Sequence, residues 1–160
     1  MGRTFCSRNF LIAICQLPAG ESQTSEPSVV HLFTPQEANK LLPDIKPKVR
    51  KLIELKKAGE ELQREADRYK LIGFMTAELA EKVAAVSAYA DRINTGVDEL
   101  EDLGVLVKEL DMGLVDFPAE KYGEVVYLCW RYGEPEVSFW HSERGGYSTR
   151  QPIKIQMIQP

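Results

Sequence analysis

The chain has 160 residues, of which 44% are hydrophobic and 9% aromatic, and it carries a formal net charge of −4 at pH 7. This length and apolar content predict one domain with a substantial core. The acidic balance argues against a surface that neutralises phosphates, so we expect no nucleic-acid partner, and we expect no membrane association.

Residues 1–27 differ in character from the rest of the chain. Two arginines precede a six-residue apolar run, FLIAIC, which resembles a signal peptide but is shorter than the usual hydrophobic region. Residues 19–27 are small and polar, which is typical of a flexible linker. We expect an unstructured extension or an upstream-extended start on a cytoplasmic protein, with export as the alternative.

Three cysteines, Cys6, Cys15 and Cys129, are spread along the chain without a CxxC pair. Their odd number and their spacing predict neither a disulfide framework nor a zinc site. A reduced, cytoplasmic protein is the simpler interpretation.

The ordered part is predicted to begin with a short apolar strand at residues 29–33, followed directly by a helix. Thr34 can cap that helix and Pro35 suits its first position. Glu37 stands where the carboxylate of a capping box reaches back to the amide of the cap. The start of the helix is therefore well marked.

Pro43 and Pro47 each remove a backbone donor from this helix, so we expect a kink or a short break near them. Beyond them, apolar or small residues recur at alternating spacings of three and four, as in coiled coils. The two series are Leu52, Leu55, Gly59, Leu62, Ala66 and Tyr69, and then Leu79, Val83, Val86, Ala90, Ile93, Val97 and Leu100. They predict two long helices.

The segment 71–75, LIGFM, separates these helices, and Gly104 is a typical terminator of the second. Two long helices joined by a short turn are expected to fold back as an antiparallel hairpin. A turn near Gly73 would bring the six cations of residues 46–57 beside the four acidic residues of 98–102. Those charges are therefore predicted to pair with one another rather than to bind nucleic acid.

After residue 104 the sequence becomes typical of β structure. Four short runs rich in β-branched and aromatic residues are separated by turns that contain Gly or Pro. The runs are VLVKEL, LVDF, EVVYLCWR and EVSFWH. They predict an antiparallel meander to which residues 29–33 and 153–158 can add strands, with one face free for the helices to cover.

The predicted fold class is α+β. A long antiparallel, coiled-coil-like helical hairpin at residues 34–103 packs on a small antiparallel β-sheet at residues 105–158. Both belong to one predicted domain, residues 28–160, which follows the N-terminal extension.

The last two runs are predicted to form a β-hairpin. If YGEP is a four-residue loop, Arg131 faces Glu136 and can form a cross-strand ion pair with it. The same register pairs Val126 with His141 and places His141 on one face with Trp130. Arg131 and Cys129 lie on the other face. A shift of one residue would alter this pairing.

His141 ends an otherwise apolar face of this predicted sheet. It can act as an acid, a base, a ligand or an anion contact, or simply form a hydrogen bond at the sheet edge. With His31 and either Asp116 or Glu134 it would complete a two-histidine, one-carboxylate metal set. The chain has no HxxH, HExxH or DxD spacing, so we expect no metal site and leave the cofactor unassigned.

The loop at residues 141–152, HSERGGYSTRQP, is the second candidate for a site. Its two adjacent glycines allow successive amides to point at one anion. Arg144 and Arg150 supply positive charge, and Ser148 and Thr149 supply hydroxyl donors. The alternative is a glycine turn with solvated arginines.

Four segments carry a family resemblance: FTPQEANKLLP, LGVLVKELDMGLVDFPA, VYLCWRYGEPEVSFWH and GGYSTRQP. In this order, from about Phe33 to Ile153, they resemble the uncharacterised bacterial family known as domain of unknown function 2203. The matching positions are Asp116, Phe117, Pro118, Trp130, Arg131, Gly133, Glu134, Trp140, His141, Gly146, Arg150, Gln151 and Pro152. Thr149 stands where the pattern often has Gly. The resemblance implies no reaction, because the members are themselves uncharacterised.

Two hypotheses of function remain, and the sequence does not decide whether the protein is an enzyme. The first is a binding or assembly module whose helical hairpin self-associates into a homo-oligomer, most simply a dimer. We favour it, because ordinary packing explains most of the residues noted above.

The second hypothesis is a site for a small anionic ligand on the C-terminal sheet, with or without catalysis. In it, Arg131 and Arg150 hold the anion, His141 handles a proton, and Asp116 or Glu134 orients the histidine.

Overall fold

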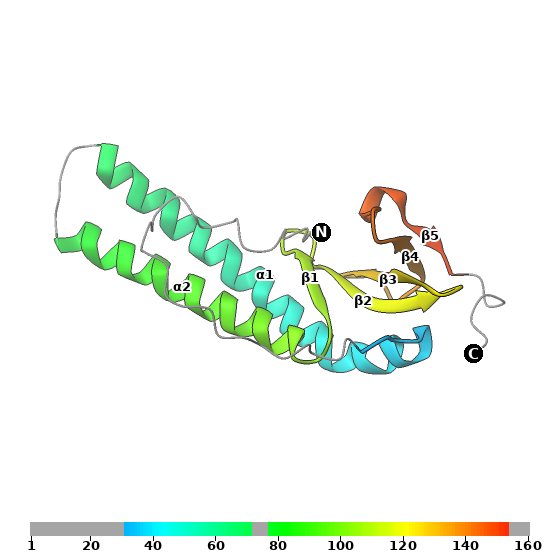
Figure 1. Cartoon of the computed structure of the whole chain (residues 1–160). Coiled ribbons are helices and arrows are strands. Elements are labelled where there is room, and N and C mark those ends of the chain that lie inside the picture. The colour runs from blue at the N-terminus through cyan, green and yellow to red at the C-terminus, as the bar shows by residue number, and fades with distance from the viewer. Residues whose placement is uncertain (1–30, 72–76, 154–160) are drawn as a thin grey trace, which may run out of the picture.

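The structure, a computed structural model, describes residues 31–71 and 77–153. Two helices, α1 (Pro35–Leu71) and α2 (Ala77–Glu101), form an antiparallel hairpin (Figure 1). Five strands follow: β1 (Leu106–Glu109), β2 (Leu114–Lys121), β3 (Glu124–Arg131), β4 (Phe139–Ser142) and β5 (Gln151–Pro152), with a short 3₁₀ helix, η1 (Tyr147–Thr149), before the last. This is the predicted α+β fold, and within the described residues no helix has the length and apolar character needed to cross a membrane.

The start of α1 has the predicted capping box. The Thr34 amide donates to Glu37 Oε2 at 2.8 Å, and the Glu37 amide donates to Thr34 Oγ1 at 3.2 Å. These bonds to Thr34 lower the pKa of the Glu37 carboxyl. Pro43 and Pro47 lie inside a helix that is continuous but changes direction near them, so the predicted kink is present without a break (Figure 1).

The end of α2 also follows the sequence. Gly104 has φ +80°, its amide donates to the Glu101 carbonyl, and the Val105 amide donates back to the Leu100 carbonyl. Such left-handed glycines satisfy the last carbonyls of a helix. The predicted turn near Gly73 lies outside the described residues. The predicted pairing of the two charged segments is present at Lys48 and Glu99, whose Nζ and Oε2 atoms lie 2.5 Å apart.

The five strands form one sheet in the order β1-β2-β3-β4-β5, with each neighbouring pair antiparallel. Side chains alternate between its two faces. The first part of α1 covers one face, and the hairpin then extends beyond the sheet (Figure 1). The core between them comprises Phe33, Ala38, Leu42, Ile45, Val49, Leu52, Leu100, Val105, Val107, Val115, Phe117, Ala119, Val126, Leu128, Trp130 and Val137. We call the opposite face, which carries Asp116, Cys129 and His141, the outer face.

The strand predicted at residues 29–33 is wrong where the structure describes it. Residues 31–33 have no regular secondary structure, and the Phe33 amide makes one bond to the Pro118 carbonyl, at 2.7 Å. The Phe33 ring packs edge-on against Phe117, so its apolar character serves the core rather than a strand. Of residues 153–158, where another strand was predicted, all but Ile153 lie outside the described part.

The predicted register of the β3–β4 hairpin is also wrong, by one residue. His141 pairs with Tyr127, not with Val126, and Cys129 pairs with Phe139. The connection, residues 132–138, is longer than a four-residue loop, and within it the Glu134 carboxylate accepts the Arg131 amide at 2.9 Å. Residues near the loop therefore form hydrogen bonds outside the β3–β4 ladder. His141 consequently lies on the face opposite Trp130, and no ion pair joins Arg131 to Glu136 within the described residues.

Asn39 of α1 contributes to this shift of register. Its side-chain oxygen accepts the Val137 amide at 2.8 Å, so that residue is held by the helix instead of by β3. A contact between residues 98 positions apart cannot be read from local turn chemistry.

Candidate functional site on the outer face

A buried carboxylate and imidazole form the centre of the outer face. His141 Nε2 lies 3.1 Å from Asp116 Oδ2, and His141 Nδ1 lies 2.9 Å from the Ser142 carbonyl oxygen. His141 is 5% exposed and Asp116 is 1% exposed. Hydrogen bonding to Asp116 raises the pKa of His141, because the nearby carboxylate stabilises the imidazolium form.

Cys129 lies beside this pair. Asp116 and Cys129 are directly opposite each other in the β2–β3 ladder, so their side chains share the outer face. Burial, with the Asp116 charge as a second cause, raises the pKa of the Cys129 thiol to about 12. Without a bound cation, Cys129 is therefore a thiol at neutral pH and not an activated nucleophile.

A second cluster surrounds Arg150. Its guanidinium lies 4.1 Å from the ring centre of Tyr147 and 4.2 Å from that of Phe139, while NH1 is 2.8 Å from Glu134 Oε1. The contact with Glu134 is an ion pair rather than a directed hydrogen bond, since no described residue offers NH1 a hydrogen-bond acceptor in good geometry. Burial opposes the charge of Arg150, but Glu134 reverses that effect and the pKa of Arg150 is raised.

This cluster also organises the loop after β3. The Glu134 carbonyl accepts the Trp130 Nε1–H at 3.0 Å, and its carboxylate holds both the Arg131 amide and Arg150. The Arg131 guanidinium lies 5.7 Å from the Tyr147 ring centre. The segment from β4 through η1 folds back over the outer face, away from α1 (Figure 1).

The structure brings all five predicted ligand-binding residues to the outer face, in two adjacent groups. Asp116 and His141 form the first group, and Arg131, Glu134 and Arg150 form the second. Because Glu134 already neutralises Arg150, the second group is partly structural. The hydroxyl of Thr149, a predicted donor to an anion, is used within the turn: it accepts the Gly146 amide at 3.0 Å and donates to the Gly146 carbonyl at 3.1 Å.

Cys129 and Lys108 belong to this site but were not predicted. Lys108 Nζ lies 3.9 Å from Asp116 Oδ2 and 5.0 Å from the Tyr127 ring centre. The alternation of β3 did place Cys129 with Arg131, so the signal was present for the cysteine. His31, in contrast, packs against Phe33 at a ring-centre distance of 4.3 Å and is not part of the site.

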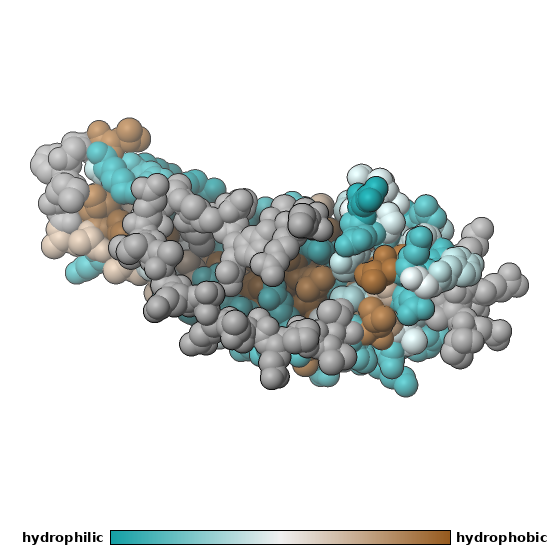
Figure 2. Space-filling view, viewed as in Figure 1, coloured by the Kyte–Doolittle hydropathy of each residue, from teal (hydrophilic) through white to brown (hydrophobic). Residues whose placement is uncertain are grey.

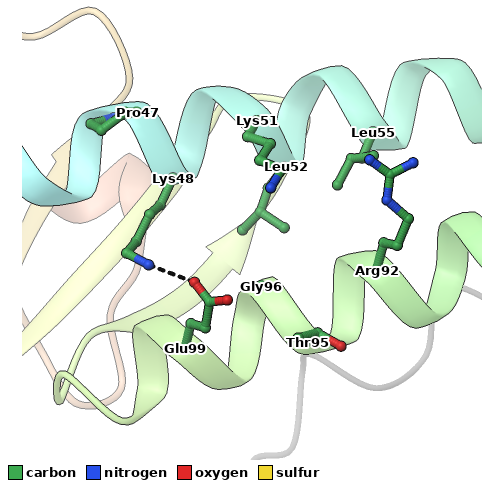
Figure 3. A pocket seen from close by; sticks show the side chains of 9 residues that line it. All are labelled: Pro47, Lys48, Lys51, Leu52, Leu55, Arg92, Thr95, Gly96 and Glu99. Atoms are coloured by element: carbon green, nitrogen blue, oxygen red, sulfur yellow. Dashed lines mark hydrogen bonds and ion pairs between the residues drawn. The ribbon is translucent and has the colours of Figure 1, made fainter.

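A separate groove of about 350 Å³ crosses the hairpin. Figure 3 shows Lys48, Lys51 and Arg92 around it, with Leu52 pointing from α1 toward Gly96 on α2. A Cβ at position 96 would lie 2.7 Å from Leu52 Cδ2, so the glycine permits this close approach. Since Lys48 is paired with Glu99, packing of the two helices explains much of the groove.

Comparison with known protein families gives one match. A family described as an uncharacterised conserved protein, DUF2203, matches residues 31–153, which include both helices and every strand. Comparison with curated proteins and with solved structures gives no match.

Proposed function

The chain belongs to the DUF2203 family, whose description assigns no activity, and we propose that it is a cytoplasmic assembly module whose helical hairpin self-associates, most simply as a homodimer. An uncharged, exposed surface of α2 carries this proposal. Residues 83–90, VAAVSAYA, contain no charged side chain, and Val83, Ala84, Ser87 and Ala88 are exposed. We call these four residues the α2 surface.

The position of the α2 surface favours a helical partner. The far half of the hairpin extends beyond the sheet, so among the described residues the two helices cover only each other there, and apolar side chains are visible at that end (Figures 1 and 2). Small side chains allow helices to approach closely. Because the α2 surface has no charged side chain, no charge has to be removed from water when it is buried.

Sedimentation velocity across a wide range of protein concentrations tests this proposal. The wild type is expected to change from monomer to dimer as concentration rises. Ala84→Glu is expected to remain monomeric, because a two-fold interface brings each introduced charge near its copy. Ala58→Glu places the same charge on an exposed residue of α1 and serves as the matched control.

Three results would contradict the proposal. A wild type that stays monomeric at every concentration would exclude self-association. A dimer that Ala84→Glu leaves intact would exclude the α2 surface as its interface. If Ala84→Glu and Ala58→Glu reduce dimerisation equally, the effect is not specific to that surface.

The gathering of Arg131, His141 and Arg150 on one face favours a second candidate function, binding of a small anion. Arg131 has no ion pair within residues 31–71 and 77–153, and Lys108 is 38% exposed at its side chain. These two cations are therefore the groups best able to receive an anion, while Arg150 holds the loop.

Thermal unfolding with inorganic phosphate or a small dicarboxylate tests this second candidate, since a ligand that binds the folded state raises the melting temperature. Arg131→Gln is expected to abolish the shift. Arg144→Gln removes an exposed cation from the neighbouring loop and is expected to retain it. Equal shifts in both variants would exclude the outer face as the anion site.

A further inference from the structure

Three neighbouring strands each contribute one metal-ligating residue to the same point on the outer face. Asp116 comes from β2, Cys129 from β3 and His141 from β4. A carboxylate oxygen, the sulfur and an imidazole nitrogen of these residues all lie within 4.8 Å of one another, and all three residues are buried. Rigid elements, rather than loops, therefore position the three donor atoms.

The hydrogen bonds of His141 direct a lone pair into this cluster. The Ser142 carbonyl can only accept a hydrogen bond, so His141 Nδ1 carries the proton in their 2.9 Å contact. In the neutral imidazole, Nε2 then presents a lone pair to Asp116 Oδ2 at 3.1 Å. Two lone pairs at this distance require a positive charge between them, which is either a second proton or a metal ion.

Asp116 supplies an independent observation. Its Oδ1 atom is buried and accepts no hydrogen bond in good geometry from the residues that the structure describes, although the residue is only 1% exposed. Leaving a buried polar atom unpaired costs about 1–3 kcal/mol, and more if the group is charged. A metal ion would satisfy this oxygen, because one carboxylate can offer both oxygens to the same cation.

We propose that Asp116, Cys129 and His141 bind a zinc-type transition-metal ion that joins β2, β3 and β4. Nitrogen, sulfur and oxygen donors together are the set that zinc accepts, and the Ser142 carbonyl orients the imidazole as outer partners of metal-bound histidines do. Bond lengths of about 2.0–2.3 Å imply donor separations of about 3.3–3.6 Å. Because the donor atoms lie within 4.8 Å of one another, their separations need to contract by about 1.2–1.5 Å at most.

This inference goes beyond the second candidate function, because it assigns a metal cation to the same outer face and does not require that an anion bind there. It is independent of self-association through the α2 surface. If the protein binds an anion but no metal, the metal site is overturned and the anion site is not. If the protein binds a metal but no anion, the metal site stands.

The test uses the full chain, reduced and freed of metal by a chelator. One equivalent of Zn²⁺ per chain is expected to raise the melting temperature, with saturation at that ratio. Co²⁺ is expected to give thiolate-to-metal charge-transfer absorption. Cys129→Ser is expected to lose this absorption, and His141→Gln and Asp116→Asn are expected to raise the Kd by at least about 100-fold.

The double variant Cys6→Ser, Cys15→Ser removes the other two thiols and is expected to behave like the wild type. Loss of the absorption in this variant, with retention in Cys129→Ser, would overturn the proposal. A wild type without a saturable response to Zn²⁺ would do the same.

A measurement on the unaltered protein covers the case in which Cys129→Ser does not fold. Zn²⁺ is expected to protect Cys129 from alkylation by at least tenfold in rate relative to the metal-free chain, as detected by mass spectrometry. An unchanged rate at saturating Zn²⁺ would show that the sulfur is not a ligand.

Discussion

The two faces of the sheet are both buried, but different interactions hold them. On the α1 side, Phe117 and Trp130 are fully buried among apolar neighbours. On the outer face, Asp116 and His141 are buried as a pair of opposite polarity. Burial alone therefore does not identify a hydrophobic core. Removing a buried apolar side chain leaves a cavity, whereas removing one partner of a buried polar pair leaves the other partner unpaired.

Substitution on the α1 side is expected to have the largest effect on stability. Trp130→Ala removes the largest fully buried side chain and is expected to lower the free energy of unfolding by about 3–5 kcal/mol. Trp130→Phe retains an aromatic ring but loses the bond from Nε1 to the Glu134 carbonyl, so a smaller loss of about 1–3 kcal/mol is expected. Urea unfolding measures the free energy of unfolding of both variants. Equal losses in the two variants would contradict the importance of ring volume.

Disrupting the polar pair of the outer face is expected to rank next. In metal-free protein at pH 5, Asp116→Asn leaves the buried imidazolium without its counter-charge and is expected to cost about 3 kcal/mol. The double variant Asp116→Asn, His141→Gln is expected to cost less than the sum of the two single losses. Additive losses would mean that the two side chains do not interact.

The smallest expected effect is the pH dependence of the same pair. Because the hydrogen bond to Asp116 raises the pKa of His141 above the ordinary value of 6.5, the native state holds this proton more tightly than the unfolded state. The stabilisation is complete below the unfolded pKa and is lost as pH rises through the folded pKa. In that window, the free energy of unfolding should fall by up to about 1.4 kcal/mol per pH unit.

Denaturant unfolding at a series of pH values, with chelator present, measures this slope. Asp116→Asn supplies the control and is expected to flatten it, since the group that raises the pKa is gone. A wild-type slope of the opposite sign would mean that His141 is neutral in the native state.

Much of the fold could be predicted because its signals are local. Thr34 and Glu37 mark the start of α1 within one turn, and Gly104 ends α2 through its own backbone geometry. The alternation along β3 correctly placed Cys129 and Arg131 on one face. Such features depend on residues a few positions apart, so they do not require knowledge of the neighbouring elements.

The candidate site could be predicted only as a set of residues. Asp116, Arg131, Glu134, His141 and Arg150 were named as candidates from the sequence. The pairing of His141 with Asp116 depended on the register between β3 and β4. A shift of one residue moves a strand's side chains to the other face. Asn39 contributes to that register by holding the Val137 amide from α1, a contact that no turn rule contains.

The sequence by itself therefore determined where the first helix begins and the second ends, that strands follow residue 104, and most of the residues of the candidate site. Tertiary structure alone decided which of those side chains meet. The physical reason is that helix caps and strand alternation are properties of neighbouring residues, whereas strand register is a balance of long-range contacts. On that balance His141 lies beside Asp116 and Cys129, rather than against the core with Trp130.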